Sequence, residues 1–295
     1  MTCLITQLTD AVTDTNLMKI TEIHLKIKTS AVKYIDFTAY QQSDVVGRIV
    51  GDGYFTDSTG SANYGKDHSY GDPYKVYLSA GEYDLYLSVK GTFRYIVFEQ
   101  FARGTLFIID NGLKYCDNVF TLSVGSLLGT DGELFNLSTD INKDMITAFY
   151  SKTNASIGEE TVEGDLSDFN IPAMTVINVI TQKVTATLSQ LESSNTLTQL
   201  RMGGVNGKIT GSVETLGQKF KNLTALAING YGSGSSLNGS VEDMLDAMVA
   251  AGRSNGNVVV QFSGSPYVTY NGAEFGSSAR TFNFGSQYPG GWALA

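Results

Sequence analysis

The hydrophobic residues in the second half of the chain recur in a six-residue pattern, with apolar side chains at the first, fourth and sixth positions. The clearest copies are LTQLRM at residues 197–202 and LTALAI at residues 223–228. Alternation over the last three positions predicts a short strand with one buried face. Looser copies occupy residues 93–98, 119–124, 145–150, 174–179 and 257–262. Copies spaced by about 25 residues are typical of a solenoid, in which each repeat forms one coil.

A second repeat, Gly-Ser-Val-Glu, occurs at residues 211–214 and again at residues 239–242. Glycine lets the chain turn sharply, and Ser212 or Ser240 can then cap a short helix whose first turn carries carboxylates. The stretch therefore predicts the outer corner of a coil. Because one coil cannot bury its own core, we expect the coils to stack.

Residues 91–262 resemble leucine-rich repeats of an irregular bacterial kind, through the LxxLxL copies quoted above. The resemblance implies a solenoid with short helices. A plain β-sandwich would also produce alternating strands, and it remains the alternative fold for this region.

The residue between the last two apolar positions of each copy is predicted to point outward, so that stacked coils place these residues in a row. The row comprises Val97, Ser123, Phe149, Asn178, Arg201, Ala227 and Gln261. Solenoids commonly bind partners along such a strand face. We therefore select Phe149, Asn178, Arg201 and Gln261 as candidate binding residues, with phenylalanine and arginine as potential interface anchors. Alternatively, the aromatic residue is covered by a neighbouring loop.

Residues 18–90 have a different pattern, with strand-like runs at residues 23–28, 32–37, 74–78 and 83–89. Three short motifs lie among them: GDG at residues 51–53, HSY at residues 68–70 and GEYDL at residues 81–85. This order resembles the PKD-type immunoglobulin-like domain. The resemblance implies a β-sandwich in which Asp52, His68 and Tyr70 brace the fold. PKD-like modules ahead of leucine-rich repeats are familiar from Bacteroidetes and their phages, and the whole arrangement resembles such a protein.

The polar segment of this front region supplies further candidates. Tyr54, Tyr64 and Tyr70 lie among Ser, Gly and Asn residues, a composition that is typical of adaptable recognition loops. The alternative is a long ordered turn packed on its own sandwich.

The same segment contains four aspartates, Asp52, Asp57, Asp67 and Asp72, whose spacing is not that of an EF-hand. Because oxygen-rich turns suit hard cations, a Ca²⁺ ion in this loop is a further possibility.

The ends of the chain complete the predicted organisation. Residues 1–17 are expected to form an arm that docks on a neighbouring subunit. Residues 263–295 are expected to cap the last coil, with Trp292 sealing the cap rather than binding a ligand. The predicted fold is therefore mainly β: a PKD-like sandwich at residues 18–90, a leucine-rich-repeat-type solenoid at residues 91–262 and a C-terminal β cap.

Charge and composition exclude several kinds of function. The net charge is −9, and the 20 basic residues form no cluster, which argues against nucleic acid as a partner. No apolar run reaches the length of a membrane span, and the first residues lack the pattern of a secretory signal. No catalytic motif is present, and the histidines are His24 and His68 alone. We expect no enzymatic activity and no cofactor apart from the possible Ca²⁺.

These observations predict a non-enzymatic structural or adhesive protein, expected in a bacteriophage virion as a fibre, decoration or tail-associated component. Its partner would be a virion subunit, a host receptor or a surface glycan, and homo-oligomerisation is a further expectation. One alternative is a bacterial cell-surface or secreted adhesin. Another is a glycan-degrading hydrolase that uses Asp131 and Glu133 as its carboxylate pair.

Overall fold

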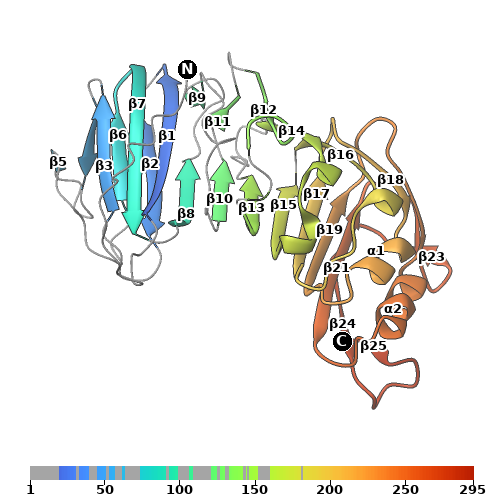
Figure 1. The fold of residues 1–295 in the computed structure, drawn as a ribbon. Helices are drawn as coiled ribbons and strands as arrows, with labels where there is room; N and C mark the ends of the chain where they lie inside the picture. The colour runs from blue at the N-terminus through green and yellow to red at the C-terminus, as the bar shows by residue number, and fades with distance from the viewer. Residues whose placement is uncertain are drawn as a thin grey trace.

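The computed structural model describes residues 20–30, 33–39, 45–50, 53–56, 62–63, 74–90, 93–98, 106–108, 121–124, 127–129, 133–141, 144, 146–151, 160–180 and 182–295. Within these residues the chain forms a 13-stranded, a 7-stranded and a 5-stranded sheet with few helices (Figure 1). The prediction of a mainly β chain is confirmed. No helix in these ranges is long and apolar enough to cross a lipid bilayer.

The front strands are antiparallel and divide between two sheets. Strands β1 (Ile20–Thr29), β7 (Gly81–Lys90) and β3 (Val45–Val50) pair within the 5-stranded sheet. Strands β2 (Lys33–Ala39), β6 (Tyr74–Leu78), β4 (Gly53–Thr56) and β5 (Ala62–Asn63) pair within the 13-stranded sheet. Strands β1, β2, β6 and β7 occur where strand-like runs were predicted. The PKD-like identity of this region stays a prediction.

The 13-stranded sheet continues past the predicted domain boundary at residue 90. Strand β8 (Phe93–Phe98) pairs antiparallel with β2 on one side and parallel with β10 (Thr121–Val124) on the other. Strand β9 (Leu106–Ile108) pairs with β1 and with β11 (Leu127–Leu128) in the 5-stranded sheet. Backbone hydrogen bonds therefore join the front strands directly to the strands that follow them.

From β12 (Phe135–Asn136) to β22 (Tyr267–Tyr270) the chain alternates between the 7-stranded and the 13-stranded sheet, and neighbouring strands of this stretch pair in parallel. The 13-stranded sheet receives β8, β10, β13 (Ala148–Ser151), β15 (Val176–Ile180), β17 (Gln199–Gly203), β19 (Ala225–Asn229) and β21 (Asn257–Ser263). The 7-stranded sheet receives β12, β14 (Val162–Asp165), β16 (Lys183–Thr187), β18 (Lys208–Ser212), β20 (Ser236–Ser240) and β22. Each six-residue copy contributes one strand, and successive coils follow one another from green to red in Figure 1.

The coil corner at the end of each strand of the 7-stranded sheet explains the Gly-Ser-Val-Glu repeat. Gly211 and Gly239 have φ angles of 118° and 103°, which side chains rarely tolerate. Short helices follow: η3 (Leu166–Asp168), η5 (Leu188–Gln190), α1 (Glu214–Lys219) and α2 (Val241–Ala250). A further 3-10 turn, η4 (Ile171–Ala173), precedes β15.

The two serines of this repeat differ in their capping role. Ser240 caps α2, because its Oγ accepts a hydrogen bond from the Asp243 backbone N–H at 3.2 Å. The predicted cap at Ser212 is wrong, since α1 begins after Val213 without a side-chain cap. The glycine turn is therefore present in both copies of the repeat, whereas the capping hydrogen bond is present only in the second copy.

The space between the two parallel sheets is filled by one continuous apolar cluster. Ile177, Leu200 and Leu226 enter it from the 13-stranded sheet, and Ile209 and Leu237 enter it from the 7-stranded sheet. All five side chains are at most 3% exposed. The inward positions of the LxxLxL copies are therefore the core of the coils, as their spacing predicts.

The C-terminal segment extends both sheets with antiparallel strands. Strands β24 (Arg280–Phe284) and β25 (Trp292–Leu294) continue the 13-stranded sheet beyond β21, and β23 (Ala273–Glu274) pairs with β22. Trp292 packs edge-on against Phe282, with 5.8 Å between ring centroids, and its indole N–H donates to Asp246 Oδ1 at 2.7 Å. These contacts agree with the packing role predicted for Trp292.

Candidate binding surface

The register of the parallel strands aligns one residue of each coil with one residue of the next coil. Pairing aligns Val97, Ser123, Tyr150, Asn178, Arg201, Ala227 and Gln261. Six of these seven residues belong to the predicted row, but Ser123, which was predicted to point outward, is fully buried. Tyr150 takes the place that was assigned to Phe149.

The prediction that Phe149 points outward is wrong. Phe149 aligns with Leu122 and Ile177, which are core positions, and its side chain is fully buried. Its ring lies 6.4 Å from that of Phe135 and 5.2 Å from that of Phe169. Residues 145–150 and residues 146–151 both fit the six-residue pattern loosely, and only the second frame buries the phenylalanine.

Three of the remaining residues, Asn178, Arg201 and Gln261, form a polar strip, and Ala227 lies between Arg201 and Gln261. Arg201 is exposed, whereas Asn178 and Gln261 are partly exposed and Ala227 is 8% exposed. The Asn178 Oδ1 atom is buried and has no hydrogen-bond partner within the described structure. The Gln261 Nε2 atom donates to the Ser277 carbonyl oxygen at 3.1 Å. The strip therefore presents a cationic side chain on the sheet and ends beside the loop that contains Ser277.

The candidates in the front region are mostly outside the described residues. Tyr54 lies in β4 opposite Tyr77, and only its backbone is described. Tyr64 and Tyr70 lie outside the described ranges, as do the loop aspartates proposed to hold Ca²⁺ (Asp52, Asp57, Asp67 and Asp72). Both predictions therefore stay predictions. Elsewhere, the described ranges contain no group of three or more His, Cys, Asp or Glu side chains that could hold a metal ion.

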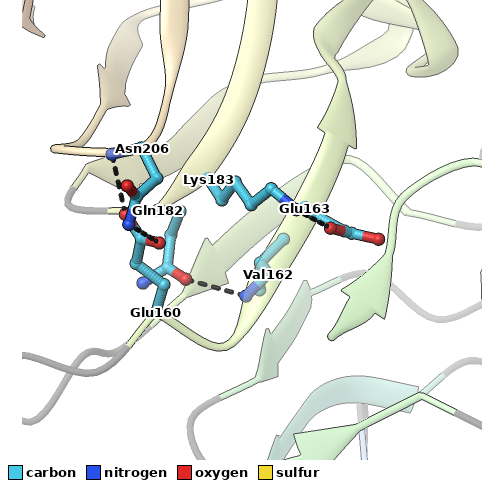
Figure 2. A network of polar contacts seen from close by, with 6 residues as sticks. All are labelled: Glu160, Val162, Glu163, Gln182, Lys183 and Asn206. Carbon is cyan, nitrogen blue, oxygen red and sulfur yellow. Dashed lines mark hydrogen bonds and ion pairs between the residues drawn. The ribbon is translucent and has the colours of Figure 1, made fainter. Parts of the chain in front are cut away.

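A buried glutamine joins three coils at the turn that leads from the 13-stranded to the 7-stranded sheet (Figure 2). Gln182 is fully buried, and its Oε1 accepts hydrogen bonds from the Thr161 and Val162 backbone N–H groups, each at 2.8 Å. Its own backbone N–H donates to the Gly203 carbonyl at 3.2 Å. Sequence reasoning missed this residue because it lies between the two repeated motifs.

Two exposed contacts also join different coils near these turns. The Asn206 backbone N–H and side-chain amide donate to the two oxygens of Glu160, at 3.2 and 2.8 Å, across 46 residues of sequence. Lys183 forms an ion pair with Glu163 at 2.8 Å. An exposed pair contributes about 1 kcal/mol at most. The buried glutamine is therefore the main polar link between these coils.

Apolar side chains are exposed on the corresponding turns of the later coils. Val205, Tyr231 and Tyr267 are 69%, 59% and 73% exposed. Val205 and Tyr231 each lie in a turn between a strand of the 13-stranded sheet and the next strand of the 7-stranded sheet. Tyr267 is the first residue of β22, which follows the corresponding turn. Exposed aromatic residues grouped on one edge indicate an interaction surface.

A pocket of about 450 Å³ lies beside two of these turns. Its lining residues are Tyr231, Phe262, Gly264, Ser265, Pro266, Glu274, Gly276 and Ser277. Gln261 adjoins it, because its side chain holds the Ser277 carbonyl. The pocket therefore continues the polar strip at the C-terminal end of the coils. The sequence could have pointed to it through the glycines that flank Tyr231.

A carboxylate stabilises one of the coil corners. Asp165 accepts hydrogen bonds from Thr185 Oγ1 at 2.6 Å, from Ser167 Oγ at 2.7 Å and from the Ser167 N–H at 2.9 Å. Partial burial raises the pKa of Asp165, but these hydrogen bonds outweigh burial and hold the pKa below its ordinary value. Ionised Asp165 therefore favours the folded state.

Replacing Asp165 with alanine should lower the free energy of unfolding by about 1 kcal/mol at pH 7, since it removes a helix cap. The folded-state pKa is depressed, so this contribution is present above the unfolded pKa of about 4 and is lost as the pH falls through the folded value. Urea unfolding at pH 7 and pH 3 measures the difference. Glu163→Gln, which removes the exposed ion pair, is the control. A loss that is as large at pH 3 would contradict the electrostatic part of this prediction.

No family model matches this chain, and its comparison with curated proteins and with solved structures gave no significant match. The fold and surface define a mainly β protein whose parallel coils present a polar strip and a pocket. The PKD-like and leucine-rich-repeat resemblances rest on the sequence motifs quoted above.

Proposed function

We propose that this protein is a non-enzymatic adhesive or structural protein that binds a partner through the outward face of its parallel coils. The polar strip formed by Asn178, Arg201 and Gln261 is the observation that carries the proposal. The resemblance to PKD-like modules followed by leucine-rich repeats favours a bacteriophage virion component. Its partner would then be a virion subunit, a host receptor or a surface glycan.

The strip has the physical features of a binding surface. Its side chains project from hydrogen-bonded strands, which hold them more precisely than loops would. Ala225, Ala227 and Gly203 flank Arg201, so a partner can approach the sheet closely. Arginine is one of the side chains that contribute most to interface energy. A partner that contacts Arg201 would therefore depend on this single residue.

Arg201→Ala and Arg201→Glu should each weaken partner binding at least about 10-fold. Labelled full-length protein can be tested on intact bacterial cells and on an array of bacterial glycans. The control is Lys208→Ala, which removes an exposed cation from β18 in the 7-stranded sheet. Both Arg201 variants should keep the unfolding midpoint because the side chain is exposed. Unchanged binding by both variants would contradict the proposal.

A further inference from the structure

The pocket beside Tyr231 is formed by three turns from different parts of the chain. Tyr231 comes from the turn between β19 and β20, and Ser265 and Pro266 come from the turn between β21 and β22. Glu274 and Ser277 come from β23 and the segment that follows it. The volume of about 450 Å³ lies within the range of small-molecule sites, which is roughly 300–1,000 Å³.

The ring of Tyr231 is held in place from one side. A Cβ atom added to Gly264 would lie 2.4 Å from Cδ1 of the Tyr231 ring, so the ring packs directly on the glycine backbone. The Tyr231 backbone N–H donates to Asn229 Oδ1 at 3.2 Å. The neighbouring Gly232 approaches the Gly207 carbonyl so closely that a Cβ atom would lie 1.5 Å from that oxygen. A fixed aromatic ring that remains 59% exposed is therefore available to a ligand.

The lining of the pocket also contains polar groups. Among the described residues, neither the Tyr231 hydroxyl nor the Glu274 carboxylate has a hydrogen-bond or ion-pair partner. The Ser265 hydroxyl donates to the Ser263 carbonyl at 3.2 Å, which leaves its oxygen able to accept. An ionised carboxylate can only accept hydrogen bonds, so a complementary ligand must supply donors. The carboxylate also repels anions, in a chain whose net charge is −9.

We propose that this pocket binds one ring of a non-anionic sugar, either neutral or amino-substituted, within a larger glycan. The C–H face of a pyranose ring would pack on Tyr231, and its hydroxyl or ammonium groups would donate to Glu274 and Ser265. A wholly apolar ligand would cover part of the exposed Glu274 carboxylate without offering it a hydrogen-bond donor, which is unfavourable. The inference rests on the proposed function, because it names the chemistry of one partner of that binding surface.

Saturation-transfer NMR with the full-length protein tests this site directly. The probes are methyl glycosides of glucose, galactose, glucosamine, N-acetylglucosamine and glucuronic acid. We expect transfer to at least one non-anionic glycoside and none to the glucuronide. Tyr231→Ala should abolish the transfer, Tyr231→Phe should retain it, and Glu274→Gln should weaken binding about 10-fold, as expected for the loss of a charged acceptor. Tyr267→Ala removes an exposed tyrosine that does not line the pocket, and it should have no effect.

The result that overturns the inference is an absence of transfer to every non-anionic glycoside, or transfer that survives Tyr231→Ala. A lysine-containing peptide is tested as a further probe. If the peptide binds and no glycoside does, the pocket binds a protein ligand, and the sugar inference is overturned. Failure here is separable from failure of the proposed function. Loss of cell binding in Arg201→Ala with no glycoside binding rejects the sugar site alone, whereas glycoside binding without any cell binding rejects the adhesive role alone.

Discussion

Replacing Phe149 with alanine should lower the free energy of unfolding by about 3–5 kcal/mol. The side chain is fully buried and contacts the rings of Phe135 and Phe169, so the substitution leaves a cavity between the two parallel sheets. Rigid neighbours from β12 and from the segment after η3 collapse poorly into such a cavity. Urea unfolding followed by far-ultraviolet circular dichroism measures the loss.

Tyr150→Ala is the matched control, because Tyr150 is the next residue of the same strand and points to the opposite face. Its side chain is partly exposed, and we expect a cost below about 1.5 kcal/mol. If Phe149→Ala were the milder change and instead abolished partner binding, the outward orientation of Phe149 predicted from the sequence would be right and the observed register would be wrong.

The contrast between these two residues shows what the hydrophobic pattern can predict. Every six-residue copy contributes a strand, because alternation of apolar residues identifies a short strand with one buried face. The pattern fails at β13, because residues 145–150 and residues 146–151 both fit the six-residue pattern loosely. A shift of one residue exchanges the buried and exposed faces of a strand. Tertiary packing of Phe149 between Phe135 and Phe169 decides the frame; Phe135 lies in the preceding coil and Phe169 is 20 residues later in the chain.

The polar residues that join the coils could not be predicted from the sequence. Gln182 receives hydrogen bonds from residues about one coil earlier and donates one to the following coil. Its role depends on where those turns lie in space, and no local pattern records that. Tyr231 also depends on a neighbouring turn, since its ring rests on Gly264. The flanking glycines are a local signal of close approach, but they do not identify the turn that is approached.

The front region shows the same limit at the level of sheets. The apolar runs correctly predict β1, β2, β6 and β7 as strands. Alternation contains no information about which edge of a sheet receives the next strand. The pairing of β2 with β8 and of β1 with β9 therefore appears only in the structure. These pairs extend both front sheets into the region beyond residue 90.

Arg253→Met should lower the free energy of unfolding by about 3 kcal/mol, because it removes the donor from one buried and two partly buried carbonyl groups. The Arg253 guanidinium donates to the carbonyl oxygens of Lys221 at 3.0 Å, of Asn257 at 2.6 Å and of Leu223. It also lies 4.1 Å from the centroid of the Phe284 ring. Methionine retains most of the side-chain volume of arginine but has no hydrogen-bond donor. The measured decrease in the free energy of unfolding therefore reflects the lost hydrogen bonds rather than a cavity.

Arg280→Met is the matched control for this prediction. Arg280 also stacks on aromatic rings, Tyr270 and Phe275, but it donates to the Phe275 carbonyl and is less buried. Its replacement should cost about 1 kcal/mol. Equal losses for the two variants would show that stacking, rather than the three carbonyl contacts, stabilises the last coils.

The charge state of Arg253 gives the same prediction a second test. Burial lowers the pKa of Arg253 to about 10, so the guanidinium is charged at neutral pH. Because the pKa of Arg253 is lower in the folded state than in the unfolded state, the folded state loses this proton at a lower pH. The free energy of unfolding therefore increases only as the pH rises through the folded-state value. The difference between the wild type and Arg253→Met should therefore be equal at pH 6 and pH 8. A difference that changed between these values would mean that another group titrates with the arginine, and that its carbonyl contacts alone do not explain the loss.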